Sequence, residues 1–327
     1  MLKERINRRS VMNLMLNNGI LMVIILLIIV TGFIEPNFIS WSNLVNVLRQ
    51  NAVIGIVACG ITYCIIGGAY DLSVGSTVSL AGVITIISIN SGMNEFLAIF
   101  LALLAGFAVG LVNGSLISMI NGRAGEAFII TYGMQVVVAS IALFPSNGLF
   151  IAGRVSDGFF KTIGRGYWPI ILFLAITIIL EFILKDTAYG RHVCFIGTNM
   201  DAAKMSGIRI KRRRVSFYVI SGVLASFAGI LLCSRVTSSN PTAGLAYEMD
   251  AIAAVVVGGT SAGGGKGSVF RTFIGAIVLG IMSNALNILG ITAYHQQIVK
   301  GLLIILAVAM DLWNKQIKER WMANERT

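Results

Sequence analysis

The chain has 327 residues, of which 56% are hydrophobic and only 12% are charged, and its mean hydropathy is +0.85. This composition excludes an ordinary soluble globular protein, in which about 25% of residues are charged. The formal net charge is +11, but the basic residues gather in the N-terminal tail, in residues 185–214 and in the C-terminal tail. That distribution is typical of the cytoplasmic parts of a membrane protein and argues against a nucleic-acid-binding protein.

The first predicted element is a membrane span at 14–33, preceded by a basic cytoplasmic tail at 1–13. A helix needs about 20 mostly apolar residues to cross a bilayer. The run GILMVIILLIIV could also be the apolar core of a cleaved signal peptide, but no small-x-small cleavage site follows it. We therefore predict an uncleaved first span.

Nine more spans are expected, which makes about ten, with both termini in the cytoplasm. They are placed at 46–66, 72–90, 97–119, 127–144, 168–184, 215–235, 250–260, 270–290 and 295–312. The predicted fold is an all-α integral membrane protein with one transmembrane domain, 14–312, and a cytoplasmic tail at 313–327. Six crossings put the basic loop 185–214 on the cytoplasmic side, as the positive-inside rule requires, although the outward loop 145–167 is also mildly basic.

Two glycine-broken segments interrupt the apolar runs: IIGGAYDLSVGS at 65–76 and VVVGGTSAGGGKGS at 255–268. Segments of this kind form half-helices and mobile cavities in transport proteins, where irregular backbone is buried in protein or faces water. They also form tight turns between closely packed helices. The sequence leaves both interpretations open. In each segment a GG pair precedes a GS pair by eight or nine residues, a weak indication of an internal repeat.

Polar residues within the apolar spans are candidates for a translocation pathway or its gate: Asp71, Ser73, Asn113, Asn284 and Asn287. Asp71 is expected near the cytoplasmic end of its span, where its carboxylate could cap a helix that begins at Leu72. The asparagines could exchange hydrogen bonds with a hydroxyl-rich neutral solute, or they could bond to neighbouring helices. Asn284 and Asn287 share a helix face because they are three residues apart.

No catalytic residue and no metal or cofactor site is predicted. GTSAGGGKGS resembles a phosphate-binding loop but lacks the required glycine at Thr260 and the required Ser or Thr at Gly267. GTSAG matches the hydrolase pattern G-x-S-x-G, but the chain has only two histidines and the context is membrane helix. The four cysteines show no pairing or metal-binding pattern.

The segment GTNMDAAKMSGIRIKRRR, residues 197–214, predicts a cytoplasmic helix of about two turns. Asn199 is a good N-cap, Asp201 lies in the first turn, and Gly207 is placed to end the helix. Ala202, Ala203, Met205 and Ile208 are small or adaptable apolar groups that a partner's groove could receive. The alternative is a helix that lies on the membrane surface, with the basic residues 211–214 anchoring the next span at the anionic leaflet.

Three segments together resemble the permease subunits of ribose-type sugar ABC importers: GGAYDLSVGS, YGRHVCFIGTNMDAAKMSGI, and YEMDAIAAVVVGGTSAGGGKGS with the following NALNILG. The resemblance covers roughly 40–312. It implies a ten-span permease that pairs with a second permease copy, cytoplasmic ATP-binding subunits that hold ATP and Mg²⁺, and an extracytoplasmic sugar-binding protein. It also implies that the short helix docks on the ATPase through Asn199, Asp201, Ala202, Ala203, Met205, Ser206, Gly207 and Ile208.

The expected function is therefore that of a non-enzymatic permease in a bacterial cytoplasmic membrane, embedded in membrane lipid and moving a pentose or hexose. An ion-coupled secondary transporter is the alternative, but it usually needs titratable residues well inside the spans, and the sequence offers almost none. A channel is less favoured because no filter motif is visible. The sequence does not identify the sugar.

Overall fold

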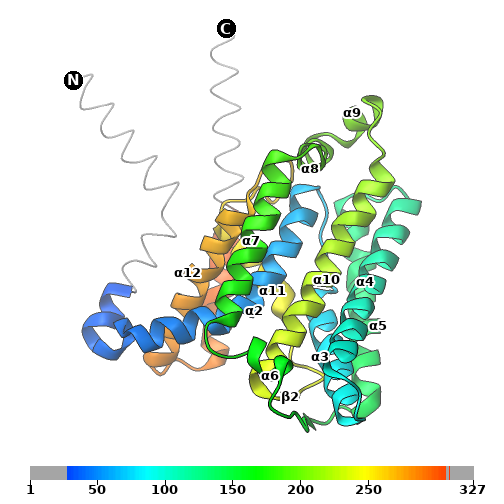
Figure 1. The fold of residues 1–327 in the computed structure, drawn as a ribbon. Coiled ribbons are helices and arrows are strands. Elements are labelled where there is room, and N and C mark those ends of the chain that lie inside the picture. Colours follow the sequence, from blue (N-terminus) through cyan, green and yellow to red (C-terminus); the bar gives the residue numbers. More distant parts are fainter. Residues whose placement is uncertain (1–27, 307–308, 310–327) are drawn as a thin grey trace, which may run out of the picture. The chain divides into compact units, whose positions relative to one another are not determined.

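The computed structural model describes residues 28–306 and 309 (Figure 1). The predicted tails 1–13 and 313–327 lie outside these residues, as do parts of the predicted spans at 14–33 and 295–312. The chain forms two compact units. One consists of Met1–Val47 with Val278–Thr327, and the other, larger unit is Leu48–Ile277.

The structure is helical almost throughout. Its elements are η1 (Pro36–Ile39), α2 (Trp41–Ile66), α3 (Val74–Asn90), α4 (Glu95–Met119), α5 (Ala124–Leu143), η2 (Phe144–Ser146), β1 (Ile151–Ala152), α6 (Phe159–Ile163), α7 (Trp168–Asp186), α8 (Ala188–Thr198), α9 (Met200–Met205), α10 (Ile210–Val236), β2 (Ser238–Ser239), α11 (Tyr247–Val257) and α12 (Val269–Ile288). The two short strands pair antiparallel, with Ile151 opposite Ser239 and Ala152 opposite Ser238.

Within the described residues, six helices are long and apolar enough to cross a membrane, so the prediction of about ten spans is not confirmed. They are Trp41–Ile66, Glu95–Met119, Ala124–Ser146, Trp168–Asp186, Ile210–Val236 and Val269–Ile288. The expected span at 72–90 is the 17-residue helix α3, and the one at 250–260 is the 11-residue helix α11. At about 1.5 Å per residue, neither α3 nor α11 is long enough to cross a 30 Å hydrocarbon layer alone.

Helix α10 is central to the larger unit and packs most extensively against α4 and α3. Its contact with α4 depends on glycines that recur every fourth residue on α4, at 106, 110 and 114. A β-carbon on Gly110 would overlap the Tyr218 carbonyl, and one on Gly106 would overlap the Gly222 carbonyl. Small residues at this spacing let two membrane helices approach backbone to backbone. This spacing of glycines was not among the features predicted from the sequence.

Replacing Gly110 with valine is expected to lower the free energy of unfolding by at least about 1–3 kcal/mol, because the side chain would be forced into the backbone of α10. Thermal unfolding of the detergent-solubilised protein measures the effect. Gly133→Ala on α5 is the matched control, since a β-carbon there meets no atom within 4 Å. If Gly110→Val and Gly133→Ala unfolded at the same temperature, close α4–α10 packing would not be a source of stability.

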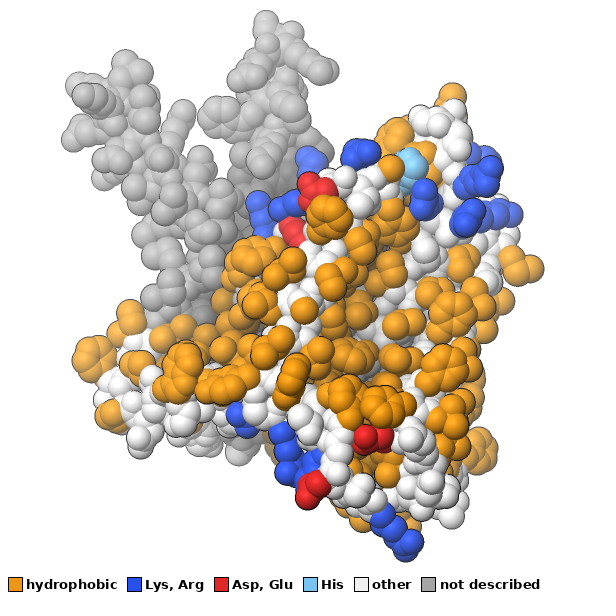
Figure 2. Space-filling model, in the orientation of Figure 1, with side chains coloured by type: hydrophobic (Ala, Val, Ile, Leu, Met, Phe, Trp, Pro, Cys, Tyr) orange, Lys and Arg blue, Asp and Glu red, His pale blue; other side chains and the backbone are white. Residues whose placement is uncertain are grey.

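The outward faces of α4, α5 and α7 are apolar and exposed. Only 28%, 22% and 28% of the apolar windows of these three helices are buried, against 67% for α2 and 61% for α10. Figure 2 shows hydrophobic side chains over the middle of the larger unit, while lysine and arginine side chains gather toward its ends. This surface suits a hydrocarbon environment, and the chain is a multi-pass membrane protein.

Two helices of the larger unit begin at a carboxylate supplied by a different helix. Glu95 accepts hydrogen bonds from the backbone N–H groups of Phe159 (3.1 Å) and Phe160 (2.9 Å) at the start of α6. Glu181 accepts in the same way from Val269 (2.6 Å) and from Phe270 at the start of α12. The first N–H groups of a helix have no partner within it, so these carboxylates satisfy donors that would otherwise be left unpaired.

Candidate functional site

Helix α9 forms where the sequence predicts it, with both ends closed by local interactions. The Asn199 side chain accepts a hydrogen bond from the Ala202 N–H at 3.0 Å. At the other end, Gly207 has a φ of +78°, the Gly207 N–H donates to Lys204 and the Ile208 N–H donates to Ala203. This is the Schellman arrangement that glycine favours. The predicted helix and its caps are confirmed, and α8 and α9 lie together at one end of the larger unit (Figure 1).

The side chains of α9 differ sharply in exposure. Met205 is 89% exposed, whereas Ala203 is completely buried within this chain. Ala203 therefore does not fit the expectation that its methyl group enters a partner's groove, because that group is already covered. Sequence reasoning could not separate the two, since the burial of Ala203 depends on long-range packing. Asp201 forms an exposed ion pair with Arg123 at 3.5 Å.

Both glycine-broken segments meet the C-terminal end of α8, directly before α9. The Gly265 N–H donates to the Ile66 carbonyl at 2.8 Å, and a β-carbon on Gly197 would overlap that same carbonyl. The Gly68 α-carbon would lie 3.0 Å from a β-carbon on Gly264. We call this contact of residues 66–68, 197 and 264–265 the glycine junction. It links the two irregular segments to each other and to the helix that leads into α9.

Three of the predicted pathway residues form one buried hydrogen-bonded chain. Asn113 Nδ2 donates to Ser73 Oγ at 2.8 Å, and Ser73 Oγ donates to Asp71 Oδ1 at 2.7 Å. All three side chains are at most 1% exposed, so in this conformation they join α4 to the start of α3. Asp71 also accepts from the Ser73 N–H at 3.1 Å, but helix α3 begins at Val74. The predicted start at Leu72 is wrong by two residues, because residues 69–72 belong to no helix or strand and α3 begins at Val74.

A further buried carboxylate, missed from the sequence, lies beside the start of α3. Glu248 on α11 is 5% exposed and accepts from Gln135 Nε2 at 2.9 Å. A β-carbon on Gly75 would overlap its second carboxylate oxygen. The only sequence signal was an acidic residue close to an apolar run. Across residues 28–306, no group of three or more His, Cys, Asp or Glu residues could hold a metal ion.

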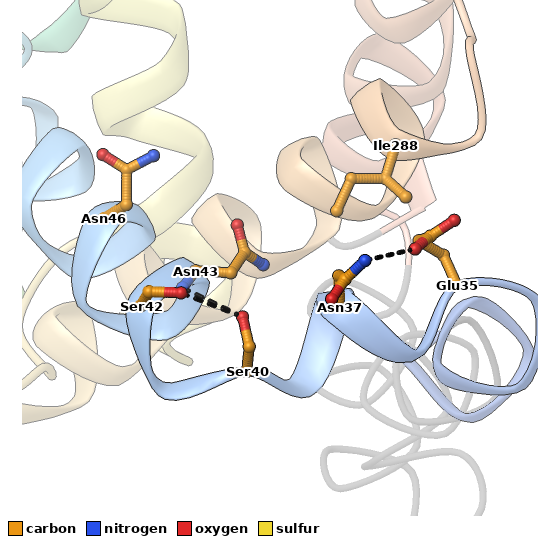
Figure 3. Close-up of a pocket in the computed structure, with 7 residues that line it drawn as sticks. All are labelled: Glu35, Asn37, Ser40, Ser42, Asn43, Asn46 and Ile288. Carbon is orange, nitrogen blue, oxygen red and sulfur yellow. Dashed lines mark hydrogen bonds between the residues drawn. The ribbon is translucent and has the colours of Figure 1, made fainter.

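The other two predicted pathway residues lie in the smaller unit, close to a polar depression of about 720 Å³ (Figure 3). The depression is lined by Glu35, Asn37, Ser40, Ser42, Asn43, Asn46 and Ile288. Asn284 and Asn43 exchange amide hydrogen bonds of 2.8 and 3.3 Å. Asn287 accepts from Gln296 at 2.7 Å. Asn284 therefore fixes the side chain of Asn43, which lines the depression. Asn46 also lines the depression, and its side chain is exposed. The run of amides and hydroxyls at 37–46 was the signal that sequence reasoning overlooked.

A family model described as the permease component of the branched-chain amino acid transport system matches residues 43–308. The chain belongs to this permease family. It is 37% identical to the ribose import permease of Haemophilus influenzae, over 95% of this chain and 98% of that one. It is 39% identical to the ribose import permease of Bacillus subtilis, over 88% and 89% of the two chains. The L-arabinose transport system permease of Escherichia coli is 34% identical, over 92% of each chain.

These relatives confirm the resemblance to ribose-type permeases that the three sequence segments predicted. In this permease the loop at 258–268, which failed as a phosphate-binding motif, is part of the glycine junction. Its glycines 259, 264 and 265 adopt positive φ angles between +77° and +82°, which residues with a β-carbon rarely adopt. Of these glycines, 264 and 265 also pack closely against the end of α8, where a β-carbon would meet the Gly197 carbonyl or Thr198.

Proposed function

We propose that this permease is the membrane-spanning subunit of an ATP-driven importer that moves a monosaccharide into the cell. Its relatives include permeases named for ribose, L-arabinose and D-allose, all of which are monosaccharides. A cytoplasmic ATP-binding subunit supplies the energy, an extracytoplasmic sugar-binding protein delivers the cargo, and two permease copies enclose the pathway.

The observation that carries the proposal is the projecting, doubly capped helix α9, connected through α8 to the glycine junction. Met205, which is 89% exposed, is the most exposed large apolar side chain of α9 and is available to an ATP-binding subunit. A push on α9 reaches both irregular segments through backbone contacts, and close-packed contacts transmit displacement rather than absorb it. The basic residues around α8–α10 support a cytoplasmic position for this end of the molecule.

The opposite end of the larger unit is the proposed landing site of the sugar-binding protein. The short helix α6 and its flanking loops carry exposed Arg154 and Arg165, and Lys161 forms an ion pair with Asp157. Arg49 Nε donates to the Gly166 carbonyl at 2.8 Å, which holds this basic loop against α2. An acidic face on the delivery protein would complement it, which accounts for basic residues on the outer side.

Reconstitution tests the proposal. The permease is placed in liposomes with its co-purified ATP-binding and sugar-binding partners, and uptake of radiolabelled ribose, L-arabinose and D-allose is measured. Uptake of at least one sugar is expected only when ATP is present on the side of the membrane that carries the ATP-binding subunit. An ATP-binding subunit that cannot hydrolyse ATP should abolish the uptake. Sugar uptake at the same rate without ATP would contradict the proposal.

A further inference from the structure

A basic pocket of about 460 Å³ lies where α9 ends and α10 begins. Its lining residues are His192, Ser206, Gly207, Ile208, Arg209, Arg212 and Arg213. Three of the seven are arginines and none carries a carboxylate. Figure 2 shows lysine and arginine side chains gathered at this end of the larger unit. A concave surface with three guanidinium groups and no acidic group attracts an anion.

Two further features leave polar groups without partners at this pocket. Helix α10 has 27 residues and no side chain caps its N-terminus, where Arg209 occupies the N-cap position. The first N–H groups of such a helix have no partner within it and bind anions well. His192 contributes a ring nitrogen, Nδ1, that is buried and has no hydrogen-bond partner among the described residues. A phosphate with several oxygens could accept from the free backbone N–H groups and from His192 Nδ1 when that nitrogen carries its proton.

One wall of the pocket is held rigid. The Arg213 guanidinium lies 5.2 Å from the centre of the Tyr189 ring, a cation–π contact. Ser216 Oγ donates its one proton to the Arg213 carbonyl at 2.6 Å. In the 2.7 Å contact between Ser216 and Tyr189, the Tyr189 hydroxyl is therefore the donor. Burial raises the pKa of Tyr189 to about 12, so this side chain stays neutral at physiological pH. The wall orients a guanidinium and adds no negative charge.

We propose that this pocket, formed by His192, Arg209, Arg212 and Arg213 beside the end of α9, binds the phosphate group of an anionic membrane lipid. The pocket lies at the first turn of a membrane-spanning helix, which is the level of lipid headgroups. A lipid bound there would restrict the motion of residues 206–209, which follow the C-terminal end of α9. It would thereby stabilise α9, the helix on which the proposed coupling to the ATP-binding subunit depends. This step rests on the proposed function, whereas lipid binding itself does not.

The test uses the purified full-length chain in a neutral detergent. Short-chain phosphatidylglycerol, short-chain phosphatidylcholine and inorganic phosphate are added separately, and bound lipid is measured by native mass spectrometry alongside the thermal unfolding midpoint. Phosphatidylglycerol is expected to bind and to raise the midpoint. In the double variant Arg209→Gln, Arg212→Gln its affinity should fall at least about tenfold, because two of the three guanidinium groups that could donate charge-assisted hydrogen bonds to the phosphate are lost.

The double variant Lys204→Gln, Lys211→Gln is the matched control, since it removes the same charge from exposed residues outside the pocket. It should retain phosphatidylglycerol binding within about threefold, because exposed charges that make no direct contact with the phosphate act only through weak, screened attraction. Equal losses in the two double variants would overturn the pocket in favour of diffuse surface attraction. Equal stabilisation by inorganic phosphate at matched concentration would overturn the lipid as ligand. Normal lipid binding by the arginine variant, combined with failure to co-purify with the ATP-binding subunit, would make the pocket a protein docking surface instead. Since lipid binding is measured without ATP, these results are independent of the transport proposal.

Discussion

Replacing Gly197 with alanine is expected to abolish ATP-driven uptake while leaving the protein inserted in the membrane. The new methyl group would overlap the Ile66 carbonyl, so the hydrogen bond from Gly265 to that carbonyl could not persist in its present geometry. Overpacking of this kind costs about 1–3 kcal/mol, and here the strain falls on the contact that joins α8 to both irregular segments. Uptake, ATPase activity and the thermal unfolding midpoint of the assembled complex are the measurements.

Two further glycine-to-alanine variants distinguish a specific effect at the glycine junction from a general loss of folding. A β-carbon at Gly68 has room, since its nearest neighbour is the Gly197 α-carbon at 3.5 Å, but its φ of +76° disfavours alanine by about 1–2 kcal/mol. Gly68→Ala should therefore slow uptake less than Gly197→Ala. Gly125→Ala, where a β-carbon meets nothing within 4 Å, should have no effect. If Gly197→Ala transported normally, the junction would play no part in transport.

Replacing Met205 with glutamate should uncouple the ATP-binding subunit without disturbing the fold. The side chain is 89% exposed, so the change touches no contact within this chain. A central apolar residue in a protein interface contributes about 2 kcal/mol or more, which corresponds to about a thirtyfold loss of affinity. Co-purification of the ATP-binding subunit and sugar-stimulated ATPase activity should both fall, with an unchanged unfolding midpoint for the isolated chain.

Met205→Leu is the conservative partner of that variant and should retain most activity, because it keeps an apolar side chain of similar volume. Ala203→Glu would be a poorer test, since Ala203 is buried and a carboxylate there would disturb α9 itself. Unchanged ATPase stimulation in the Met205→Glu complex would place the docking contact elsewhere.

Features set by neighbouring residues could be predicted from the sequence. Asn199 and Gly207 specify the ends of α9 through hydrogen bonds that reach no more than five residues along the chain. The paired glycines at 67–68 and 258–259 correctly indicated irregular segments. Hydrophobic runs located most of the long helices within a few residues, because a spanning helix needs a fixed length of apolar chain.

Features set by distant residues could not be predicted. The capping of α12 by Glu181 joins residues 88 apart, and the bond between Asn43 and Asn284 joins residues 241 apart. Ala203 and Met205 differ in burial although both are apolar and two positions apart on one helix. The apolar content of 72–90 predicted a full span, whereas the helix begins only at Val74, because composition does not reveal where an irregular segment ends and a helix starts.

The start of α3 differs from an ordinary uncapped helix N-terminus in its electrostatics. A helix N-terminus carries a partial positive charge that attracts anions. At α3 this position is already taken by this chain's own oxygens: Asp71 accepts from the Ser73 N–H, and the Glu248 carboxyl group lies against Gly75. The positive end of α3 is therefore screened by oxygen atoms of the same chain, and because those side chains are buried it offers no exposed anion-binding site.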